Sequence, residues 1–140
     1  MNLEEVTTEY DDALRQLKKR VETVFHDNFM NFFVSNPKIY GITWSQYTPY
    51  FNDGDPCYFT MGEFFVIGSE EELEEARSGS SPYNFSSIYD LRNKPDMQSV
   101  VDFVAALDKM PSEVMEGMFG DGVQVVASRD GFKVFEYSHD

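Results

Sequence analysis

Three oxygen-bearing side chains in one turn are the first candidates for metal chemistry in this sequence. Asn52, Asp53 and Asp55 stand between two prolines, and amide and carboxylate oxygens are the ligands that hard cations prefer. Their spacing departs from the calcium-binding loop, which has acids at alternate positions, then a glycine and a late glutamate. The same residue types, with Gly54 among them, are typical of tight turns. Taken alone, this segment therefore favours a turn over a metal site.

A denser group of carboxylates comes later in the chain. Five glutamates fall within six positions: Glu70, Glu71, Glu72, Glu74 and Glu75. A second acidic segment covers residues 4–12. Such segments often form a solvated surface, and a negative patch also steers association with a positive one. We therefore predict that the five glutamates bind a basic protein partner, with a solvated surface as the alternative.

Aromatic residues gather around the proline-flanked turn. Those near the turn are Trp44, Tyr47, Tyr50, Phe51, Tyr58 and Phe59. They are explained by packing inside a large hairpin, or by an exposed interface, since tryptophan and tyrosine dominate binding hot spots. On the second interpretation, Trp44 and Tyr50 are predicted to contact the partner.

The usual catalytic and cofactor-binding signatures are missing from the sequence. The two histidines, His26 and His139, are far apart, and Cys57 has no second cysteine at zinc-ligand spacing. No glycine-rich phosphate-binding motif follows a predicted strand. The sequence therefore predicts no catalytic residue and no cofactor, leaves the metal question open, and favours a protein that is not an enzyme.

Composition narrows the class of protein. The 140 residues include 25 acidic and 11 basic side chains, for a formal charge of −14. This charge argues against direct binding to nucleic acid, which requires cations to displace phosphate counterions, and against anionic membranes. With 41% hydrophobic and 16% aromatic residues, the chain can bury a core, and its length predicts one domain over residues 1–140.

The expected location is the cytosol. The chain starts with an acidic segment where a signal peptide would be basic, and no stretch approaches the roughly 20 apolar residues of a membrane span. A single cysteine fits a reducing compartment.

The residues from Leu3 to about Asn28 are predicted to form one long helix. Apolar side chains recur there at intervals of three or four, and no glycine or proline interrupts them. We expect this apolar face to dock on the protein's own sheet, with self-association into a homodimer as the alternative.

The remaining elements predict an α+β fold. One hairpin is expected from strands at 39–48 and 57–67, and another from strands at 123–128 and 132–137 around Asp130-Gly131, a strong hairpin signal. Helices are expected after Ser69, over 97–110 and over 112–118. Without strand–helix–strand alternation, a parallel sheet is disfavoured. We predict an antiparallel sheet of two hairpins, with the long helix and the shorter helices packed on one face.

Two segments resemble small bacteriophage and bacterial proteins of unknown function. One is the hairpin motif from Trp44 to Cys57, WSQYTPYFNDGDPC, and the other runs from Met118 to Asp140. The resemblance implies a phage or bacterial cytosolic origin and carries over no activity. It also draws attention to polar residues that would form one cluster if the hairpins meet: Asn52, Asp53, Asp55, Asp121 and His139.

Two functions follow from these observations. The first is a small acidic interaction protein, acting as an inhibitor or decoy of a basic host protein such as a nucleic-acid enzyme or a defence factor. The alternative is a ligand-binding domain or enzyme in which the carboxylate cluster holds Mg²⁺ and a phosphate-bearing ligand. The identity of the partner, the oligomeric state, a ligand pocket and the convergence of the acidic segments depend on tertiary geometry.

Overall fold

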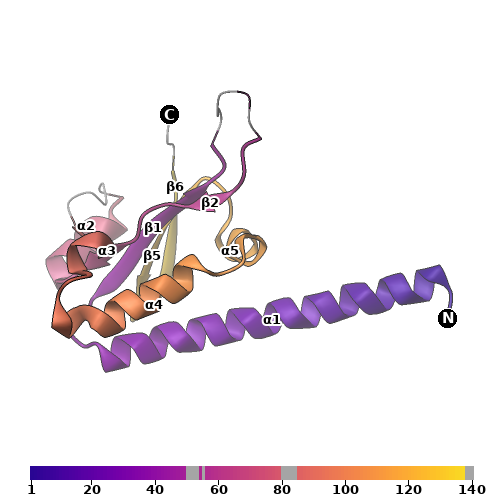
Figure 1. Ribbon diagram of the computed structural model, residues 1–140, viewed down its shortest axis with the longest axis horizontal. Coiled ribbons are helices and arrows are strands. Elements are labelled where there is room, and N and C mark those ends of the chain that lie inside the picture. Colours follow the sequence, from indigo (N-terminus) through magenta and orange to yellow (C-terminus); the bar gives the residue numbers. More distant parts are fainter. Residues whose placement is uncertain (50–53, 55, 80–84, 138–140) are drawn as a thin grey trace.

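The computed structural model describes residues 1–49, 54, 56–79 and 85–137. The elements, in chain order, are α1 (Leu3–Ser35), β1 (Gly41–Tyr47), β2 (Thr60–Met61), β3 (Phe65–Ile67), α2 (Glu70–Arg77), β4 (Ser86–Ser87), α3 (Ile88–Leu91), the 3₁₀ turn η2 (Pro95–Met97), α4 (Gln98–Asp108), α5 (Ser112–Phe119), β5 (Val123–Ser128) and β6 (Gly131–Glu136). Figure 1 shows a sheet flanked by helices, with α1 running along one side and extending well past its neighbours.

The two predicted hairpins form one antiparallel sheet. The strand order is β4-β3-β1-β5-β6, and β2 also pairs with β1. β1 and β5 lie side by side from the pair Gly41–Ser128 to the pair Gln46–Val123. The β5–β6 turn ends at Gly131, whose φ of +119° is a conformation that favours glycine.

The strand partner of β1 contains a bulge. Thr43 lies opposite Phe65 and Gln46 lies opposite Met61, so three steps along β1 match four steps along the other strand. One extra residue on that side interrupts the ladder. The predicted strand over 57–67 is therefore two short strands, β2 and β3.

Helix α1 is longer than the sequence predicts. The Asn2 side chain accepts the backbone N–H of Glu5 at the start, and the helix ends at Ser35, with Asn36 as its C-cap before a proline. The predicted end near Asn28 is too early, because the aromatic run that follows continues the helix and packs against the core. Its 33 residues span about 50 Å at about 1.5 Å per residue, whereas the seven residues of β1 span about 23 Å. The sheet is thus too short to cover α1.

An aromatic core joins the second half of α1 to one face of the sheet. Phe29 is fully buried, with its ring 4.9 Å from Phe103 of α4 and 5.2 Å from Phe132 of β6 between centroids. Phe32 stacks on Phe103 at 4.2 Å. Side chains of α3, α4 and α5 complete the same cluster, which anchors residues 25–33 of α1.

Helix α2 covers the opposite face of the sheet. Leu73 and Ala76 pack with Phe65, Ile67 and Val126, strand residues that alternate with those of the aromatic core. The α+β class with a long N-terminal helix is confirmed, with one refinement. α2 lies on the other face from the remaining helices, which share one face as predicted.

Candidate functional site

The first two-thirds of α1 carries apolar side chains that the fold leaves exposed, or half-buried at Val21. We define the apolar stripe as Leu3, Val6, Tyr10, Ala13, Leu14, Leu17, Val21 and Val24. Leu3, Tyr10 and Leu17 keep 84%, 66% and 56% of their surface exposed, and every described residue up to position 20 is exposed. The expectation that this stripe docks on the protein's own sheet is wrong for residues up to position 20, because the N-terminal part of α1 extends beyond the sheet (Figure 1).

A groove adjoins the end of the stripe, between α1 and α4. Its volume is about 380 Å³. Its lining consists of Leu17, Arg20, Val21, Val24, Phe25, Asn28 and Phe29 of α1 with Phe103, Ala106, Leu107 and Met110. At about 100° per residue, the stripe lies about 90° around α1 from the buried phenylalanines. It therefore points along the side of the helix on which the groove opens, and the two form one continuous apolar surface.

The glutamate surface on α2 lies apart from this apolar surface. The helix starts after Ser69, as predicted: Ser69 caps it by accepting the N–H of Glu72, and the Glu72 carboxylate accepts the N–H of Gly68. The other four glutamates are exposed. Within the described residues, ion pairs join Arg15 to Asp12 and Arg77 to Asp130, and neither involves these glutamates.

The two acidic segments do not converge in this structure. α2 lies at one end of the molecule, and the N-terminus of α1 lies at the other (Figure 1). A single partner surface that spans both segments would have to be as long as α1.

Trp44 belongs to the core and is not available to a partner. Its side chain has no exposed surface, and its Nε1–H donates to the Oε1 of Gln46. The Gln46 amide in turn donates to the carbonyls of Met115 and Gly120, at 2.9 and 2.8 Å. The prediction that Trp44 contacts a partner is wrong, because the side chain packs in the core on the face of the sheet that α1 and α4 cover. Tyr50 lies outside the described residues.

Of the residues in the predicted polar cluster, the structure describes one, Asp121. Its carboxylate accepts the backbone N–H and the hydroxyl of Thr48, at 2.9 and 2.7 Å, and so joins the loop before β5 to the end of β1. Four other predicted members lie outside the described residues, namely Asn52, Asp53, Asp55 and His139. Among the residues that are described, no three His, Cys, Asp or Glu side chains are arranged to hold a metal ion. The carboxylate-cluster alternative stays a prediction.

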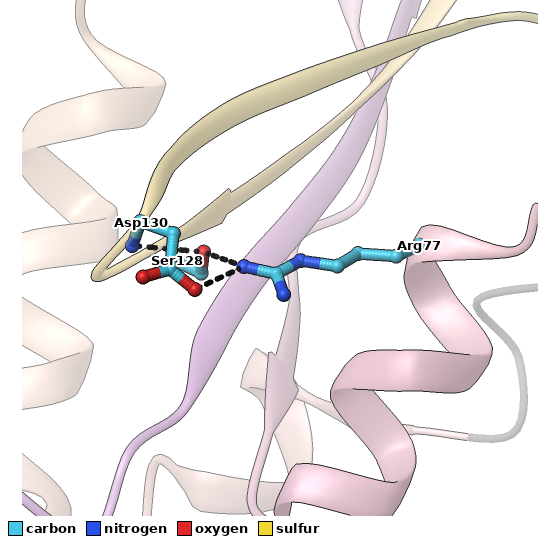
Figure 2. Close-up of polar contacts among 3 residues, drawn as sticks. All are labelled: Arg77, Ser128 and Asp130. Atoms are coloured by element: carbon cyan, nitrogen blue, oxygen red, sulfur yellow. Dashed lines mark hydrogen bonds and ion pairs between the residues drawn. The ribbon is translucent and has the colours of Figure 1, made fainter.

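A second, smaller hollow of about 90 Å³ lies beside Arg77. Figure 2 shows the Arg77 side chain reaching from α2 to the β5–β6 turn, where it donates to Ser128 Oγ at 2.7 Å and Asp130 Oδ2 at 2.8 Å. Lys133 donates to the Arg77 carbonyl. Through these contacts, Arg77 and Lys133 attach α2 to the β5–β6 hairpin of the sheet.

Comparison with known proteins identifies no relative. No family model matches the chain, and no curated protein or solved structure matches it. Along the described part of the chain, no helix combines the length and the apolar character needed to cross a membrane.

The groove is the part of the candidate site that the sequence did not predict. It depends on how α4 packs beside α1, which spacing within either helix does not reveal. The stripe itself is visible in the sequence as apolar residues spaced by three or four. Comparing the length of the predicted helix with the length of the predicted strands was the available signal that part of the stripe would lie beyond the sheet.

Proposed function

We propose that this protein is a non-enzymatic interaction protein whose docking surface is the apolar stripe of α1 together with the adjoining groove. The observation that supports this function is the exposure of large apolar side chains along a helix that extends beyond the fold. Contiguous apolar surfaces of this kind mark interaction sites in folded proteins, and an amphipathic helix is a common recognition element.

A matched pair of variants tests this function. Leu14→Lys places a charge within the stripe, whereas Thr8→Lys adds the same charge on the opposite face of the same exposed segment. In affinity capture from bacterial lysate, wild type and Thr8→Lys should each recover a protein in stoichiometric amount. A second copy of this chain counts as such a protein. Leu14→Lys should lose it. Equal recovery with Leu14→Lys would contradict the proposal.

A second candidate function uses the glutamate surface of α2. The exposed glutamates and the formal charge of −14 support a protein that binds a basic host factor, as an inhibitor or decoy in the cytosol of a bacterial or phage-infected cell. The absence of a described ion pair at these four side chains leaves their charge available for such a partner.

The test reverses the four exposed glutamates of α2 to lysine and leaves Glu72 in place as part of the helix start. The control makes four exposed acids on other elements into lysines, namely Asp96, Asp108, Glu113 and Glu116. A basic partner should be captured by wild type and control, released by salt, and lost from the α2 variant. Capture that survives the α2 reversal would exclude this surface.

A further inference from the structure

The apolar stripe has the same spacing when read from either end. Its positions are symmetric about the midpoint between Ala13 and Leu14. The pairs at equal distance from this midpoint are Leu3 with Val24, Val6 with Val21, and Tyr10 with Leu17. If two copies of α1 lie antiparallel and centred here, each apolar residue is level with an apolar residue of the other copy. A two-fold interface requires this self-complementarity, because each contact occurs twice with the two copies exchanged.

The charges of the same segment select the antiparallel orientation. Acidic side chains dominate residues 4–12, and basic side chains dominate residues 15–20, so the antiparallel alignment sets the acidic part of one helix level with the basic part of the other. Helical geometry places Glu9 and Arg20 on one flank of the stripe and Asp11 and Lys18 on the other. In an antiparallel pair like flanks face each other, so Glu9 faces Arg20 of the second copy and Asp11 faces its Lys18. A parallel pair would set acids against acids.

The groove lies where this alignment places the end of the second helix. Leu3 and Val6 of the second copy are level with Val24 and Val21 of the first, and both valines line the groove between α1 and α4. The alignment that the symmetric stripe gives therefore also places apolar residues of the second copy at the groove.

We propose that a second copy of this chain covers the apolar stripe, with the two α1 helices antiparallel over residues 3–24 and the start of each in the groove of the other. The overlap is about 33 Å at about 1.5 Å per residue. The proposal rests on the proposed function, since it names the partner of the same docking surface.

Sedimentation equilibrium of the full chain tests the partner. Wild type should sediment at twice its 16.2 kDa mass. Leu14→Lys should weaken the dimer at least about 100-fold, because the new charges meet across the two-fold midpoint and like charges at an interface cost several kcal/mol. Thr8→Lys should stay dimeric, and circular dichroism should show both variants folded. A monomeric wild type at about 100 µM, or a dimeric Leu14→Lys, would overturn the self-pairing.

Disulfide cross-linking tests the orientation, with Cys57→Ser as the background. Under oxidation, a mixture of Val6→Cys and Val21→Cys chains should cross-link, because these positions are level across the pair. Val6→Cys alone should not, since its two copies lie about 22 Å apart along the axis and a disulfide requires Cα atoms within about 7 Å. Cross-linked Val6→Cys alone would overturn the antiparallel arrangement. A monomeric wild type whose captured protein is still lost in Leu14→Lys would refute self-pairing and leave the proposed function standing.

Discussion

Replacing Gln46 by leucine should destabilise the fold by removing the hydrogen bonds of its buried side-chain amide. Gln46 and Trp44 are both fully buried, and the Gln46 amide links the Trp44 indole to the carbonyls of Met115 and Gly120. Leucine fills much of the same space but leaves the buried indole N–H without its acceptor. The Met115 carbonyl lies within helix α5 and keeps its helical hydrogen bond. The Gly120 contact is only partly buried, so water can satisfy that carbonyl.

The expected loss follows from the buried indole N–H. An orphaned buried donor costs about 1–3 kcal/mol, so Gln46→Leu should lower the free energy of unfolding by about 1–3 kcal/mol. Urea denaturation followed by circular dichroism measures this, with an unchanged m-value indicating an intact native state.

A double-mutant cycle with Trp44→Phe isolates the physical reason. Once phenylalanine has removed the indole N–H, Gln46→Leu no longer orphans that donor and should cost about 1 kcal/mol less than in wild type. A Gln46→Leu loss below about 1 kcal/mol, or a cycle without coupling, would refute the reasoning.

Two further substitutions test how the sheet is held together, and a third, in a helix, serves as a control. Arg77→Met should cost about 0.5–1 kcal/mol and less in high salt, because its ion-pair partner is 80% exposed; a salt-independent loss in urea denaturation would contradict this. Gly41→Ala should cost about 1–3 kcal/mol, because its Cβ would lie 2.7 Å from the Ala127 carbonyl oxygen. Gly117→Ala, in a helix with no atom within 4 Å of the new Cβ, should instead stabilise by about 0.5–1 kcal/mol. Thermal unfolding of the two alanine variants should shift in opposite directions, and equal shifts would contradict the packing described for β1.

Local sequence signals predicted most helices and strands, but not which face of each one packs against the rest of the fold. The Asp130-Gly131 turn and the alternation around it predicted β5 and β6, and Ser69 predicted the start of α2. Strand alternation could not tell which face of β1 lies against α1, so the sequence left Trp44 between core packing and an exposed interface, and the structure places it in the core. Periodicity in residues 3–24 likewise identifies an apolar face without identifying what covers it. The groove depends on contacts between α1 and α4 that are distant in the sequence.

The most direct test of self-recognition through α1 is a charge exchange between two variants. One variant carries Glu9→Lys and Asp11→Lys, and the other carries Lys18→Glu and Arg20→Glu, all at exposed positions. Each variant alone should be monomeric or weakly dimeric by sedimentation at low salt, because like charges then face each other across the pair. An equimolar mixture should form a heterodimer, in which all these pairs are again opposite in sign. Variants that dimerise alone as tightly as wild type, or a mixture that stays monomeric, would contradict the account.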